Sequence, residues 1–70
     1  MEKLTLLETR VIDGQNVDIY RVKTMEYNGD YLTSYRAVWA TGRHDFFGWP
    51  TNEDVQRVLT PPTISVIIQS

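Results

Sequence analysis

The dipeptide Asn28-Gly29 constrains the fold of this chain more than any other short segment. Both residue types tolerate the positive φ values that a two-residue hairpin turn of type I′ requires. The segments on either side are rich in β-branched and aromatic residues, which favour strands. The sequence therefore predicts a hairpin in which a strand over residues 17–27 pairs with a strand over residues 31–41.

A two-residue turn at this position pairs Tyr27 with Asp30 and places Arg21 directly opposite Arg36. One side of the predicted sheet then carries Tyr20, Val22, Tyr31, Tyr35, Ala37 and Trp39. The other side carries a cluster of three cations, Arg21, Lys23 and Arg36, among aliphatic residues. We expect a helix to cover the ring-rich side. The basic side is then either a solvated outer face or a contact surface for an acidic partner.

Three further segments have clear signals. Residues 3–12 are predicted to form a first strand, followed by a turn at Asp13-Gly14-Gln15-Asn16. A short helix is expected over residues 52–59, capped by Thr51 together with Asp54 and ended by Pro61-Pro62. Residues 63–69 are predicted to form a final strand that returns to the sheet, where an exposed edge could pair with another chain.

These elements predict one small α+β domain over residues 1–70 with the order βββαβ. Its architecture would be an antiparallel three-stranded meander, one short helix packed on the sheet and a C-terminal fourth strand. A core of this size gives only marginal stability, so burial against a second copy is a natural supplement.

Composition excludes several classes of protein. Seven Lys and Arg stand against nine Asp and Glu, for a net charge of −2, which disfavours bulk attraction to nucleic acid. The chain has no cysteine, so disulfides and thiolate metal sites are excluded, and a cytoplasmic location is expected. No apolar run is long enough for a membrane span or a signal peptide.

Catalysis has little support in the sequence. His44 is the only histidine, and none of Ser34, Ser65 and Ser70 lies at a glycine-flanked elbow of the hydrolase type. One histidine and no cysteine do not make a zinc site, and the glycines are scattered rather than gathered in a phosphate loop. The sequence predicts neither an enzyme nor a bound cofactor or metal.

The segment over residues 42–50 is the strongest functional candidate and is expected to be a loop. It concentrates Phe46, Phe47 and Trp49 just after Arg43. These rings either plug the gap between sheet and helix or protrude as anchors for a partner, as aromatic hot spots do.

The sequence thus predicts a non-enzymatic binding module or small regulator that recognises another protein, of a kind common among bacterial and phage accessory proteins. A homodimer is one form of that recognition, and a nucleic-acid-binding sheet is the alternative function. The predicted contact residues are Arg21, Lys23, Arg36, Arg43, Phe46, Phe47 and Trp49.

Overall fold

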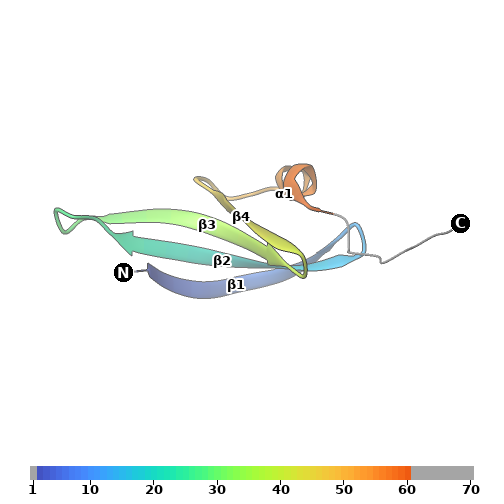
Figure 1. The fold of residues 1–70 in the computed structure, drawn as a ribbon, viewed down its shortest axis with the longest axis horizontal. Helices are drawn as coiled ribbons and strands as arrows, with labels where there is room; N and C mark the ends of the chain where they lie inside the picture. Colours follow the sequence, from blue (N-terminus) through green and yellow to red (C-terminus); the bar gives the residue numbers. More distant parts are fainter. Residues whose placement is uncertain (1, 61–70) are drawn as a thin grey trace, which may run out of the picture.

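The computed structural model describes residues 2–60, which form one four-stranded antiparallel sheet and one helix (Figure 1). In chain order the elements are β1 (Glu2–Ile12), β2 (Gln15–Met25), β3 (Tyr31–Trp39), β4 (Gly42–Phe46) and α1 (Asn52–Val58). Each strand pairs with the next one along the chain, so the strand order is β1-β2-β3-β4. None of the helical structure within these residues is long and apolar enough to cross a membrane.

The predicted order βββαβ is wrong. The fourth strand of the sheet is β4, which precedes the helix and comes from the segment that we expected to be a loop. Its side chains alternate, with Arg43 and Asp45 on one side of the sheet and His44 and Phe46 on the other. Charged residues disguise this alternation because they are uncommon in strands. The strand predicted over residues 63–69 lies outside the described residues.

The two hairpin turns also differ from the prediction, which placed the two-residue turn at Asn28-Gly29. The two-residue turn with two positive φ values is Asp13-Gly14, with φ of 51° and 76°, and it joins Ile12 to its partner Gln15. The loop after β2 is longer. The amide of Gly29 donates to the carbonyl of Glu26 at 3.0 Å, and the amide of Glu26 donates to the carbonyl of Asp30.

With φ of 92° at Gly29, this arrangement is a three-residue hairpin loop that ends in a left-handed glycine. The extra loop residue shifts the register of β2 against β3 by one position. Arg21 therefore lies opposite Tyr35, and Arg36 lies opposite Tyr20, so the predicted Arg21–Arg36 pair is wrong. A shift of one residue exchanges the two sides of a strand.

On β3, the side covered by α1 is the ring-rich side, as predicted. On β2, it is the side that we expected to face away from the helix. Ala37 and Trp39 face the helix as expected, whereas Val17 and Ile19 replace Tyr20 and Val22. The core cluster consists of Ile12, Val17, Ile19, Ala37, Trp39 and Val55, with Phe46, Val58 and Leu59 packed against it.

A bulge at Leu7 reverses the alternation of β1, because Leu6 pairs with Tyr20 and Glu8 pairs with Ile19. Leu4 and Leu6, which precede the bulge, lie on the side away from the helix. Beyond the bulge, Arg10 and Ile12 lie on the helix side. The bulge thus turns the even-numbered residues of β1 from the side away from the helix to the helix side.

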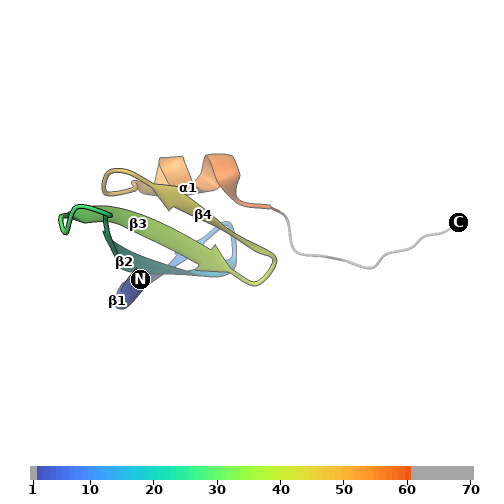
Figure 2. The same cartoon turned by 60° about the vertical axis from the view of Figure 1, so that its left-hand side comes forward.

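The helix is held by its cap and by polar contacts to the sheet. The Thr51 hydroxyl accepts from the amide of Asp54 at 3.1 Å and the Asp54 carboxylate accepts from the amide of Thr51 at 3.0 Å, which confirms the predicted cap. The indole of Trp39 donates to the Thr60 hydroxyl at 2.9 Å, just after the helix. The helix lies on one side of the sheet (Figure 2), toward the end that holds the turn between β1 and β2 (Figure 1).

Candidate functional site

The structure divides the predicted contact residues between the two sides of the sheet. Arg21, Lys23 and Phe46 lie on the helix side, whereas Arg36 and Arg43 lie on the opposite side. Phe47 follows β4 and is 85% exposed. The predicted residues therefore do not form one surface, and each side has to be considered separately.

We call the side away from the helix the open face. It consists of Leu4, Leu6, Tyr20, Val22, Leu32, Arg36 and Val38, together with the polar residues Glu2, Asp18, Ser34, Arg43 and Asp45. Leu4, Leu6 and Leu32 are 42%, 53% and 47% exposed. These leucines make the open face the most aliphatic exposed surface of the sheet.

Arg36 is the centre of the open face and is bound within the chain. Its guanidinium donates to both carboxylate oxygens of Asp45, at 2.6 and 3.1 Å, and to both of Glu2, at 3.3 and 3.1 Å. This double fork holds the pKa of Asp45 below its usual range and raises that of Arg36. With both acids already bound, Arg36 has little left to offer a partner's carboxylate.

The bond between Arg36 and Glu2 also explains why a residue on the open face is buried. Arg36 belongs to β3 and Glu2 to β1, so the pair spans the intervening strand β2. Val22 lies between the β2 partners of these two residues and is only 1% exposed. The long arginine stem is the natural cover for this valine.

The other candidate surface is the end of the helix side that α1 leaves uncovered. Arg21 of β2, Tyr35 of β3 and Phe46 of β4 form one row across the sheet. In the next row Lys23 lies directly opposite Lys3 of β1. We call this the cation–aromatic surface, defined as Lys3, Arg21, Lys23, Tyr31, Tyr35 and Trp49.

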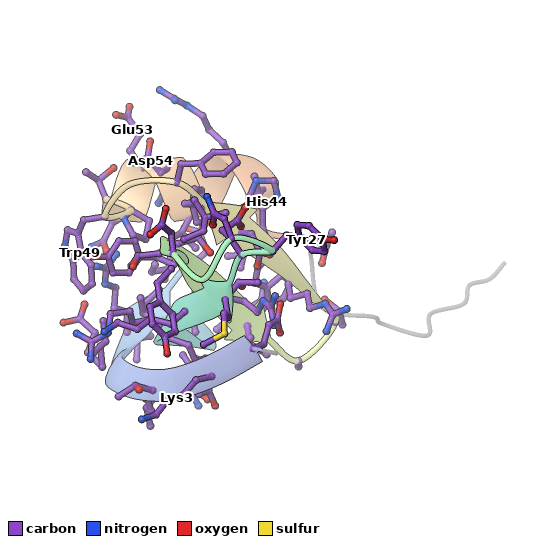
Figure 3. The ribbon with its side chains drawn as sticks, turned by 90° about the vertical axis from the view of Figure 1, so that its left-hand side faces the viewer. Lys3, Tyr27, His44, Trp49, Glu53 and Asp54 are labelled. Atoms are coloured by element: carbon purple, nitrogen blue, oxygen red, sulfur yellow. The ribbon has the colours of Figure 1, made fainter. Side chains whose placement is uncertain are left out.

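Trp49 joins this surface to the helix. Its ring meets Tyr35 edge-on, with ring centroids 5.3 Å apart, and the guanidinium of Arg10 lies 5.2 Å from the indole centroid. Figure 3 views the molecule from this end, with Trp49 at the left margin between helix and sheet and Lys3 below. Trp49 is 50% exposed, so part of the ring is available to a ligand.

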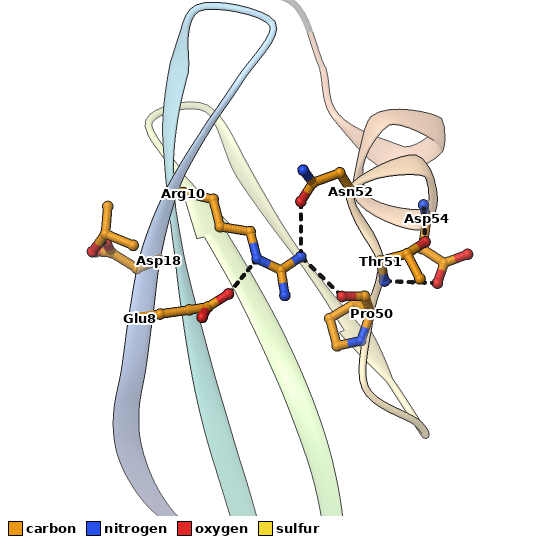
Figure 4. Close-up of polar contacts among 8 residues, drawn as sticks. Glu8, Arg10, Asp18, Pro50, Thr51, Asn52 and Asp54 are labelled. Atoms are coloured by element: carbon orange, nitrogen blue, oxygen red, sulfur yellow. Dashed lines mark hydrogen bonds and ion pairs between the residues drawn. The ribbon is translucent and has the colours of Figure 1, made fainter.

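Arg10 is a residue that sequence reasoning missed. Figure 4 shows its guanidinium donating to the Pro50 carbonyl at 2.9 Å, to the Asn52 side chain at 3.2 Å and to Glu8. Arg10 therefore fixes the start of α1 to β1 and supports the indole of Trp49. Without the bulge at Leu7, alternation from Leu4 and Leu6 would place Arg10 on the wrong side of the sheet, so no sequence signal identifies its role.

The cations of the chain differ sharply in how they are paired. Arg10, Arg36 and Arg57 each bind carboxylates. In residues 2–60, four cations make no ion pair: Lys3, Arg21, Lys23 and Arg43. The first three share the cation–aromatic surface, whereas Arg43 lies on the open face. Like charges directly opposite on neighbouring strands are destabilising, so Lys3 and Lys23 are an uncompensated cost in the fold.

The loop aromatics are split between the two alternatives drawn from the sequence. Phe46 is partly buried and packs against the core. Trp49 is half-exposed on the cation–aromatic surface, and Phe47 points into solvent. The ring of His44 lies 4.8 Å from that of Phe46, and the adjacent Asp45 is bound to Arg36 on the other side of the sheet.

Comparison of the chain with protein-family models, with curated proteins and with solved structures gave no match. Within residues 2–60, no three His, Asp or Glu side chains converge as a metal site would require. The candidate surfaces are accordingly judged on their geometry and charge.

Proposed function

We propose that this protein is a non-enzymatic binding module that recognises another protein through the open face, and that the protein recognised is a second copy of the same chain. The observation that supports this proposal is the group of half-exposed leucines, Leu4, Leu6 and Leu32, around an arginine already bound by two carboxylates. Burying such residues is favourable by roughly 25 cal/mol per Å² of apolar surface.

Charge on the open face favours a partner of the same kind. Arg36 and Arg43 are balanced against Glu2, Asp18 and Asp45, so this side of the sheet is close to neutral. A strongly charged partner would gain little from such a surface, whereas a neutral aliphatic one would bury its leucines. A second open face has these properties, and two-fold pairing of identical surfaces is the commonest form of self-association.

The non-enzymatic part of the proposal rests on the surroundings of His44. The imidazole is exposed and its ring neighbour is Phe46. Asp45 is directed to Arg36, and Ser34 lies on the open face. A nucleophile, a base and an orienting carboxylate therefore do not converge among the described residues.

Sedimentation equilibrium of the full chain tests the proposal. We expect a monomer–dimer equilibrium for the natural sequence and a shift to monomer in Leu6→Lys, because a lysine at that position would be buried in the interface without a partner. Leu6 is 53% exposed, so the substitution should leave the fold of the monomer intact, as circular dichroism would verify.

Phe47→Lys is the matched control. This residue is more exposed than Leu6 but lies in the loop after β4, outside the residues that define the open face. The control variant should dimerise like the natural chain. A chain that is monomeric at all concentrations, or a dimer that is lost in Phe47→Lys and kept in Leu6→Lys, would overturn the proposal.

A further inference from the structure

We infer that the cation–aromatic surface binds single-stranded nucleic acid, with the cations contacting phosphates and the exposed rings stacking on bases. This surface lies on the opposite side of the sheet from the open face, so the inference does not depend on the proposed dimer.

The cations are placed where the fold alone gives no reason for them. Lys3 and Lys23 are direct cross-strand partners, and Arg21 lies two residues before Lys23 on the same side of β2. Within the described chain none of the three has a carboxylate partner, and residues 61–70 contain no Asp or Glu. A ligand with successive negative charges would turn this repulsion into attraction.

The rings of the same surface are exposed and held in defined positions. Tyr31 is 61% exposed, and the ammonium of Lys23 lies 5.9 Å from its ring centroid. Trp49 is half-exposed and fixed between Tyr35 and Arg10. Along β3, Tyr31 and Tyr35 are four residues apart on one side, or about 13 Å. Rings spaced along a basic sheet surface are the usual platform for stacking bases of a single strand.

An acidic peptide is the competing ligand, and the surface suits it less well. Peptides bind sheets mainly by adding a strand at an edge or by filling apolar pockets with alternate side chains. The cation–aromatic surface is a sheet side, not an edge. Of the aliphatic residues in the adjoining paired rows, Ile19 and Ala37 are buried and Met25 is exposed. Flat exposed rings beside unpaired cations are better matched to bases and phosphates.

The net charge of −2 does not oppose this inference, because most acids of residues 2–60 lie off this surface and Glu8, which lies on the same side of the sheet, is bound by Arg10. Glu2, Asp18 and Asp45 are on the open face, and Glu53 and Asp54 are at the start of the helix. Glu26 and Asp30 flank the loop at the tip of the hairpin, which marks the end of the surface.

Fluorescence anisotropy with a labelled oligothymidylate of about ten nucleotides tests the inference on the full chain. We expect binding at low salt, with the logarithm of the affinity falling against the logarithm of salt with a slope of about −2, since three cations each contribute about 0.7 on a single strand. Lys23→Gln should reduce this slope by about 0.7. Tyr31→Leu should weaken binding at least about fivefold with little change in slope.

The chain offers a matched control for each variant. Arg57→Gln removes an exposed cation on α1, outside both surfaces, and Tyr27→Leu removes a fully exposed ring in the hairpin loop. Both controls should bind like the natural chain. The inference would be overturned by undetectable oligothymidylate binding, by equal losses in the controls, or by tighter binding to an oligoglutamate peptide that Tyr31→Leu does not weaken.

Discussion

Two arginines on opposite sides of the sheet, Arg36 and Arg21, differ in how their charge is paired. On the open face, Arg36 is forked onto Asp45 and Glu2, and its side chain is only 12% exposed. On the helix side, Arg21 stands beside Tyr35 and near Lys23 without an ion pair among residues 2–60. The first arginine serves the fold, and the second leaves its charge available to a ligand.

This difference teaches that residue type and position in a strand are insufficient to assign a binding role. Arg21 and Arg36 are equally attractive contact residues in the sequence. Their roles diverge because Arg36 reaches Asp45 on the neighbouring strand β4 and, across β2, Glu2 on β1. The cross-strand neighbours of Arg21 are instead Thr5 and Tyr35. The identity of those neighbours depends on the register, and the register depends on the hairpin loop.

The largest expected change in stability comes from comparing a valine on each side of the sheet. Val17 is fully buried under the helix, and Val11 on the open side is 71% exposed. Val17→Ala should lower the free energy of unfolding by about 2 kcal/mol, because two methyl groups are lost and a cavity remains. Val11→Ala should change it by less than about 0.5 kcal/mol. Urea denaturation measures both, and similar losses in the two variants would show that the helix does not define the buried side.

A smaller loss of stability is expected at Gly42, next to Trp39 on the side of the sheet that the helix covers. A Cβ atom at Gly42 would lie 3.1 to 3.3 Å from three ring atoms of Trp39, closer than ordinary contact. Gly42→Ala should therefore cost about 1 kcal/mol and disturb the near-ultraviolet dichroism of the indole, since Trp39 is held by Thr60 and cannot easily withdraw. Gly48→Ala is the control, because a Cβ there meets nothing within 4 Å. Equal stability of the two variants would contradict the packing described for Trp39.

Most of the local structure was predictable from the sequence because it rests on local signals. The capped helix after Thr51 and the long strands of the first two hairpins follow from short-range patterns that the structure confirms. The inner side of β3, with Ala37 and Trp39 toward the helix, was also predicted correctly. The order βββαβ was wrong because residues 42–46, expected to be part of a loop, form β4, whose polar residues pair by backbone bonds with a partner set by the tertiary fold.

The contact surface was less predictable because it depends on single-residue shifts. The sequence Glu26-Tyr27-Asn28-Gly29 suits a type I turn followed by a left-handed glycine as well as a two-residue turn, and the two differ by one position in register. The bulge at Leu7 introduces a second shift in β1. Neither register shift has a sequence signal strong enough to override the simple alternation of side chains. The neighbours of Arg10, Lys3 and Tyr35 could therefore be identified only from the structure.

The smallest expected effect is on the pKa of Asp45, and it tests whether the charge of Arg36 is fully paired within the fold. The guanidinium of Arg36 lowers the pKa of Asp45, mainly through their hydrogen bonds. A carboxylate whose folded pKa is depressed contributes stability above its unfolded value, about 3.9, and this contribution is lost as the pH falls through the folded pKa. Because the Asp45 side chain is 51% exposed, the contribution should be below about 1 kcal/mol.

Arg36→Gln should return the pKa of Asp45 to its usual range or above, since Glu2 then remains nearby without a cation between the two acids. Carbon-detected NMR titration of the carboxyl group measures this directly. Arg43→Gln is the control, because Arg43 acts on Asp45 through a weaker coulombic effect and makes no hydrogen bond to it among the contacts of the described chain. If the pKa of Asp45 moves as much in the control as in Arg36→Gln, then Arg36 is not specifically engaged, and its charge would be as available to a ligand as that of Arg21.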